Sequence, residues 1–176
     1  LVKSLVLVEP AVSTLLVANQ KSSAQLLSLL LRSPSVALAA RRFQSGSLNP
    51  SLKALDSGEV QRAVELNVDG VQDLKGAYGK MPEAARKMML DNARTIAELR
   101  TDFPRFTAEE ARRISSRTLV INGEASALWL RRIGELLAGA VPRARRVLVP
   151  GARHFPHMEN PEGFNAQAIS FLEEKA

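Results

Sequence analysis

Two histidines lie three residues apart, and the first of them, His154, follows Gly151 in the pattern Gly-x-x-His. An imidazole titrates near neutral pH, so it can take a proton from a nucleophile or a water and return it later. Gly151 ends an apolar run, and Asn160 with Pro161 marks a helix start. His154 is therefore predicted on a short turn, either as a general base or as a loop histidine that bonds the backbone.

A general base that works through one ring nitrogen needs a carboxylate on the other, to fix the tautomer and stabilise the imidazolium. Glu9 ends the apolar run Leu5-Val6-Leu7-Val8, and reactive groups of open α/β sheets gather at the C-terminal ends of strands. Glu124 follows a later apolar run and is a competitor. Glu9 has its own alternative, a solvated carboxylate at the end of a strand.

The sequence contains only weak patterns for binding a metal or a nucleotide cofactor. His157 and Glu159 beside His154 give a weak metal pattern, because catalytic zinc draws three protein ligands from rigid positions. The Gly79-Lys80 pair lacks the first glycine of a phosphate-binding loop and is followed by methionine, and no Gly-x-Gly-x-x-Gly is present. We expect no metal and no cofactor, and we expect His157 to pack near the loop.

The elements that position these residues are predicted from apolar patterns. Leu5 to Val8, Arg117 to Asn122 and Arg146 to Val149 are typical of buried strands. A helix from about 127 to 140 separates the last two, and a terminal helix presents Phe164, Ala168, Phe171 and Leu172 on its apolar side. This alternation predicts an α/β fold with parallel neighbouring strands.

The middle of the chain carries helical signals. Helix N-termini are predicted at Asp56 with Glu59, at Pro82 and at Thr107 with Glu110. Breaks are predicted at Ser33-Pro34 and in the segment from Ser45 to Pro50, and Ser45-Gly46-Ser47 is interpreted as a linker. The predicted domains are a core strand at 1–10, a helical cap at 11–115 and a C-terminal βαβα unit at 116–176.

The order of strand, Gly-x-x-His, Asn160-Pro161-Glu162 and terminal helix resembles the C-terminal half of the α/β-hydrolase superfamily. The resemblance covers both ends of the chain, and the middle only by position. It implies a partial α/β-hydrolase fold with a helical cap insertion. It also implies that His154 is the catalytic base.

The chain departs from that family in two places. The usual acid site after the penultimate strand holds Ser126, which cannot carry the charge, so the resemblance to relatives such as certain haloalkane dehalogenases assigns the acid to Glu9. No Gly-x-Ser-x-Gly elbow or Asp equivalent occurs in the chain, and Ser45-Gly46-Ser47 lies between helical segments instead of after a strand. We therefore expect a fragment, or a processed chain, that is inactive by itself.

Two functions from different classes remain. The first is a hydrolase acting on an ester, a carbon–carbon bond, a halide or an epoxide of a small hydrophobic substrate, with this chain supplying base and acid but not the nucleophile. The second is a noncatalytic module, either a degenerate hydrolase or a cap used for binding. A nucleophile elbow encoded upstream would favour the first function, and a true start at Leu1 the second.

Composition limits the partners. The net charge is +6, but the arginine pairs are spread along the chain and aromatic residues make up only 5%, so we expect no nucleic-acid binding. No apolar run is long enough for a bilayer, and the absence of cysteine fits a reducing compartment, so a cytoplasmic location without membrane binding is expected. A missing half would expose apolar surface, hence self-association.

Overall fold

The computed structural model describes residues 2–19, 21–100 and 105–174. The chain divides into two compact units. The first combines Leu1–Ala37 with Pro104–Ala176, and the second is Leu38–Phe103. The cap predicted at 11–115 rests on helix signals alone and stays a prediction.

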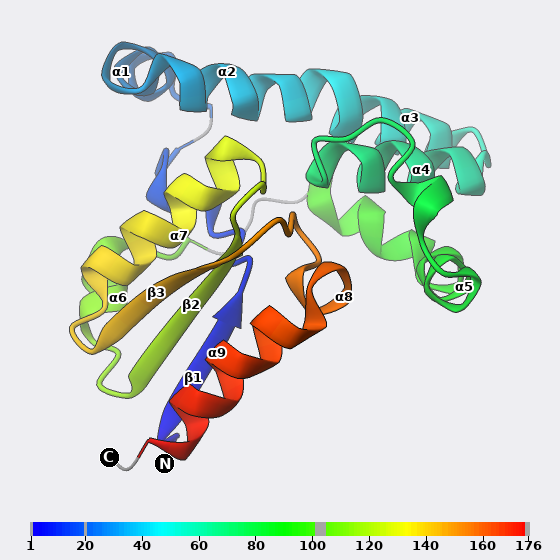
Figure 1. Cartoon of the computed structure of the whole chain (residues 1–176). Helices are drawn as coiled ribbons and strands as arrows, with labels where there is room; N and C mark the ends of the chain where they lie inside the picture. Colours follow the sequence, from blue (N-terminus) through cyan, green and yellow to red (C-terminus); the bar gives the residue numbers. More distant parts are fainter. Residues whose placement is uncertain (1, 20, 101–104, 175–176) are drawn as a thin grey trace. The chain divides into compact units, whose positions relative to one another are not determined.

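The first unit is built on a parallel sheet of the strands β1 (Ser4–Val8), β2 (Arg117–Gly123) and β3 (Ala144–Val149), with β2 in the centre (Figure 1). The predicted parallel pairing is confirmed. Val8 pairs with Ile121, and Gly123 pairs with Val149, so the C-terminal ends of the three strands meet at one edge.

Helices cover both faces of this sheet (Figure 1). Successive side chains of β2 point to opposite faces, so each face presents apolar side chains to the helices that cover it. Leu119 and Ile121 pack toward α9 (Pro161–Glu173), and Val120 packs toward α7 (Leu128–Ala140) and α6 (Ala108–Arg112). Because β2 is buried on both faces, its sequence is a nearly continuous run of hydrophobic residues.

The terminal helix α9 begins where the sequence indicates. The side chain of Asn160 accepts a hydrogen bond from Gly163 N at 2.9 Å, and Pro161 occupies the first turn. Of the predicted apolar side, Ala168 and Phe171 are buried. The prediction for Leu172 is wrong, because this side chain is 57% exposed.

The remaining elements of the first unit flank the second unit in the chain or lie between β3 and α9. The turn η1 (Ser13–Leu15) follows β1, and α1 ends at the predicted break before Pro34, where α2 begins. Thr107 forms the predicted capping box with Glu110 at the start of α6. The other helices are α1 (Ser23–Arg32), α2 (Pro34–Phe43), whose end belongs to the second unit, and α8 (Pro156–Glu159).

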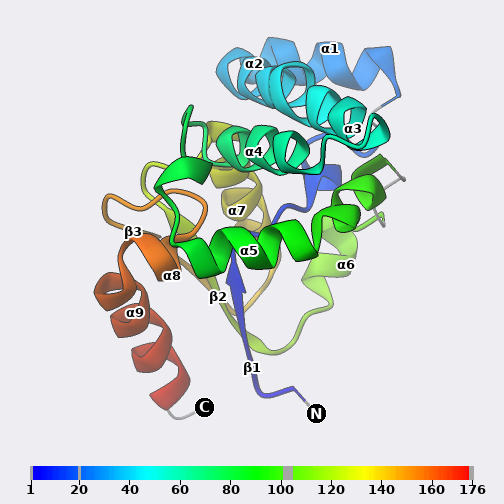
Figure 2. The same cartoon turned by 90° about the vertical axis from the view of Figure 1, so that its right-hand side faces the viewer.

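The second unit is helical, and α3 packs along α4 (Figure 2). The hydroxyl of Ser51 on α3 donates to the carbonyl of Ala63 on α4 at 2.7 Å. Its elements are η2 (Gln44–Leu48), α3 (Asn49–Asp56), α4 (Val60–Val71), η3 (Tyr78–Lys80), α5 (Glu83–Asp91) and η4 (Ala93–Arg100), with the end of α2. In the described part of the chain, every helix is too short or too polar to cross a membrane.

The break predicted from Ser45 to Pro50, with a linker at Ser45-Gly46-Ser47, is wrong. The chain there forms a π-helical turn that joins α2 to α3, and Ser47 is buried with its hydroxyl bonded to the carbonyl of Leu66 on α4. A side chain at Gly70 would collide with Ser47, so the small residues permit close packing of α4. Tertiary packing thus overrides the local turn preference of serine and glycine.

The helix start predicted at Asp56 with Glu59 is also wrong in detail. Asp56 ends α3, and α4 begins at Val60 with no side-chain cap from Glu59. Gly58 adopts a positive φ of 77° at the break between the two helices. The glycine therefore sets this boundary, and the acidic residues on either side do not.

Candidate active site

The predicted site residues lie at the C-terminal edge of the parallel sheet. Glu9 follows β1, Gly123 ends β2, and His154 lies in the loop after β3. This is the edge at which reactive groups of open α/β sheets gather. All of these residues belong to the first unit.

The carboxylate of Glu9 is buried and strongly hydrogen-bonded, with its side chain only 3% exposed. Its Oε1 accepts hydrogen bonds from Gly123 N at 2.6 Å, from Ser126 Oγ at 2.7 Å and from Asn122 Nδ2 at 3.3 Å. Its Oε2 lies 3.3 Å from His154 Nδ1. One oxygen therefore anchors the carboxylate, and the other faces the imidazole.

The backbone of Glu9 is strained. Its φ is +47°, in the left-handed region that a side chain such as glutamate rarely adopts. The amide of Glu9 still donates to the carbonyl of Ile121 at 2.8 Å, so the sheet ladder continues to this residue. Such a conformation costs on the order of 1 kcal/mol or more and persists only when the surroundings fix it.

The histidine loop is held against the end of β2. A Cβ at Gly123 would lie 2.1 Å from the carbonyl oxygen of Arg153, so only glycine allows this close approach. Glu124 accepts from Gly151 N at 3.0 Å, and Glu159 accepts from Arg153 N at 2.8 Å. Glu159 also accepts from Phe155 N at 3.2 Å, so the loop is fixed on both sides of His154.

The His154 ring is accessible at the end of this loop, with 20% of its side chain exposed. Its centroid lies 5.1 Å from that of the Phe155 ring. A carboxylate at Nδ1 favours a proton on that nitrogen and leaves Nε2 as the acceptor. This arrangement can take a proton from a nearby hydroxyl or water and stabilise the imidazolium that results.

A buried amide connects the carboxylate to a cation on the neighbouring strand. Asn122 is fully buried, and its Oδ1 accepts from Arg146 Nε at 3.0 Å while its Nδ2 donates to Glu9. Burial lowers the pKa of the Arg146 guanidinium, with the positive charge of Arg131 acting in the same direction and Glu135 opposing it.

The other residues considered from the sequence have other partners in the structure. Glu124 bonds Gly151, and His157 packs its ring against Phe155 and Phe164, at 6.4 and 6.0 Å between centroids. Ser47 belongs to the second unit. Over residues 2–19, 21–100 and 105–174, no group of three or more metal-binding side chains is present.

Sequence reasoning misses three residues that hold the carboxylate and the loop. From the sequence, Ser126 is noted only because it occupies the usual position of the catalytic acid. In the structure its hydroxyl donates a hydrogen bond to Glu9. Asn122 is predicted only as part of a strand, although a polar residue inside an apolar strand signals a buried hydrogen bond. The sequence suggests Glu159 as a weak metal ligand, yet its carboxylate bonds loop amides.

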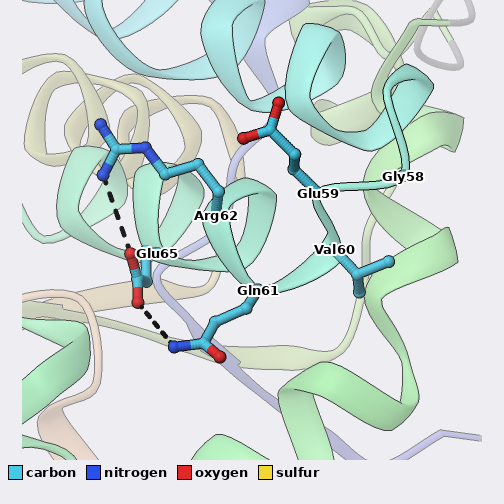
Figure 3. Close-up of a pocket in the computed structure, with 6 residues that line it drawn as sticks. All are labelled: Gly58, Glu59, Val60, Gln61, Arg62 and Glu65. Carbon is cyan, nitrogen blue, oxygen red and sulfur yellow. Dashed lines mark hydrogen bonds and ion pairs between the residues drawn. The ribbon is translucent and has the colours of Figure 1, made fainter.

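A cavity of about 520 Å³ lies in the second unit, at the start of α4 (Figure 3). Glu65 lies there between two partners, Gln61 Nε2 at 3.0 Å and Arg62 at 3.7 Å. The polar side chains drawn are thus largely paired with one another, and we assign no function to this cavity.

The parallel sheet, the helices on both faces and the histidine loop after the last strand define a partial α/β-hydrolase fold. Among solved structures, the chain is similar to that of MenH from S. aureus, with a TM-score of 0.58 and 17% sequence identity. The match covers 98% of this chain but only 59% of the MenH chain, and at this identity it shows the fold alone. No family model and no curated protein matches the sequence.

Proposed function

We propose that this chain carries the general base, His154, and its carboxylate, Glu9, of an α/β-hydrolase that acts on a small hydrophobic substrate. The observation that carries the proposal is the 3.3 Å approach of a buried, triply hydrogen-bonded carboxylate to an accessible imidazole. The bond cleaved is an ester, a carbon–carbon bond, a halide or an epoxide.

The proposed mechanism assigns each group one task. His154 Nε2 takes the proton from a serine nucleophile, or from the water that hydrolyses an aspartyl ester, and returns it to the leaving group. Glu9 holds the proton on Nδ1 and stabilises the imidazolium. The nucleophile and the oxyanion hole are supplied from outside this chain, since its sequence has no nucleophile elbow.

The hydrophobic substrate is inferred from exposed apolar side chains in both units. Leu26 and Leu30 on α1 are 46% and 43% exposed, and Met88 on α5 is 57% exposed. These three side chains are accessible to an apolar substrate.

The test uses a protein extended by the sequence encoded upstream of Leu1. If that sequence supplies a serine elbow, a fluorophosphonate probe should label the extended protein and leave the 176-residue chain unlabelled. His154→Ala should lower turnover of short esters by about 10²–10⁴-fold, with thermal unfolding nearly unchanged. His157→Ala is the matched control and should retain activity.

Two results would contradict the proposal. The first is full activity in His154→Ala. The second is hydrolysis by the 176-residue chain that disappears when Ser45 or Ser47 is replaced. An extended protein with no elbow and no turnover on esters, haloalkanes or epoxides would instead favour a noncatalytic module.

A further inference from the structure

An arginine-lined cleft lies in the first unit, between α7, β3 and the junction of α1 with α2. Its volume is about 540 Å³, within the range of small-molecule sites. Arg32, Arg131, Arg132 and Arg146 line it, and Glu135 is the one acid among the described residues that do so. The lining is thus strongly positive.

The charges in this cleft are only partly compensated. Glu135 pairs with Arg132 at 2.8 Å. Arg131 Nε is buried and has no hydrogen-bond partner in the described part of the chain. An unpaired buried donor is costly, and burial beside a like charge already disfavours the protonated form of Arg146. An anion against these guanidinium groups would offset the repulsion between their like charges.

The cleft is also pre-organised. The Arg146 guanidinium is held by the fully buried Asn122, so its remaining nitrogens are presented without further ordering. The N-terminal end of α2, at Pro34, lies in the lining and adds a partial positive charge. Val36 and the half-buried Leu128 give the same cleft an apolar part.

We propose that this cleft binds a phosphate monoester with an apolar substituent. Planar guanidinium groups can donate paired hydrogen bonds to the oxygens of a phosphate. A phosphate monoester carries nearly two negative charges at neutral pH, which would balance the excess positive charge of the arginines. The apolar side chains contact the substituent. Arg146 is linked to Glu9 through Asn122, but the cleft is lined by other residues than Glu9 and His154. Its proposed ligand does not depend on the proposed hydrolase activity.

The probe is phenyl phosphate, titrated into the intact chain by calorimetry, with phenol and inorganic phosphate as comparisons. We expect one saturable site, weaker binding of inorganic phosphate and no binding of phenol. Arg131→Gln and Arg32→Gln, on different helices, should each weaken phenyl phosphate by about tenfold or more. Arg143→Gln changes the same charge at an exposed position outside the cleft and should leave the affinity unchanged.

A second arm distinguishes a soluble ester from a lipid headgroup, using vesicles of phosphatidylcholine with phosphatidic acid. If the chain sediments with these vesicles, and Arg131→Gln abolishes this while Arg143→Gln preserves it, the phosphate belongs to a lipid. If the chain does not sediment with the vesicles, the phosphate belongs to a soluble ester. The site is refuted if phenyl phosphate shows no saturable binding. It is equally refuted if Arg143→Gln weakens binding as much as Arg131→Gln and Arg32→Gln do.

Discussion

Glu9 combines a strained backbone with a carboxylate whose two oxygens have separate partners. One oxygen accepts from the sheet end and from Ser126, and the other faces His154. Strain of this kind persists where surrounding contacts fix the residue, and it is concentrated at functional sites. At the residue scale, the orientation of this one carboxylate decides which nitrogen of His154 carries the proton.

Glu9→Gln tests this orientation in the chain as it stands. The amide oxygen should take the place of Oε1, since three donors face it, and the amide nitrogen would then donate to His154 Nδ1. The proton should therefore move from Nδ1 to Nε2. Long-range ¹H–¹⁵N spectra of the histidine ring report the change, with His157→Gln used to assign the two histidines.

Glu124→Gln is the matched control for this experiment. Glu124 accepts from the amide of Gly151, at the start of the histidine loop, so its replacement should leave the tautomer of His154 unchanged. The same tautomer of His154 in Glu9→Gln and in the unmodified chain would refute the assignment of Glu9.

At the element scale, close packing of α7 against β2 supports the buried amide of Asn122. A Cβ at Gly134 would lie 2.0 Å from Asn122 Oδ1, whereas a Cβ at Gly139 on the same helix meets nothing within 4 Å. The two glycines of α7 therefore differ in what a methyl group would do.

Gly134→Ala should destabilise the chain by about 1–3 kcal/mol, because α7 must move away from β2 or Asn122 must shift. Gly139→Ala should be neutral or stabilise by up to about 1 kcal/mol, through helix propensity. Urea unfolding of both variants measures the difference. Equal stability of the two variants would show that Asn122 yields without cost.

The capping box of α6 gives a pH-dependent prediction. The backbone amide of Thr107, and then its hydroxyl, lower the pKa of the Glu110 carboxyl. A carboxylate whose pKa is lower in the folded state stabilises the fold above its unfolded pKa, and this contribution is lost as the pH falls through the folded pKa.

Glu110→Gln should therefore unfold at a lower temperature than the unmodified chain at neutral pH, and the difference should vanish in acid. Thermal scans across the acid range measure it. Glu109→Gln removes only an exposed ion pair with Arg113 and should change the unfolding temperature little. A difference for Glu110→Gln that grows in acid would contradict a lowered pKa of this carboxyl.

At the scale of the whole molecule, the first unit exposes both a strand edge and an apolar helix face. β1 pairs only with β2 among the described strands, and Leu27 and Leu31 on α1 are 55% and 75% exposed. Open edges and contiguous apolar patches favour association.

We expect the 176-residue chain to self-associate with increasing concentration. Replacing Leu27 and Leu31 together by lysine should shift sedimentation velocity profiles toward the monomer. Leu172→Lys, at a comparably exposed position on α9, is the control and should change the profiles less. A monomer at all concentrations would contradict the expected association.

Local patterns in the sequence are enough to predict the α/β class, the three parallel strands, the cap of α9 at Asn160 and the turn that holds His154. Apolar periodicity, proline and capping side chains act over a few residues, so their effects can be predicted from the sequence without knowledge of the fold. The break predicted from Ser45 to Pro50 is wrong because Ser47 packs against α4, a contact that the neighbouring sequence does not show.

The tertiary structure alone decided how the site is assembled. Glu9 and His154 are 145 residues apart, and Ser126 and Asn122 reach the same carboxylate only because β1 and β2 pair in one register. Sequence indicated which side chains could do chemistry, since chemistry belongs to residue types. Strand register and close backbone approach decided which of them meet, since both depend on how distant segments pack.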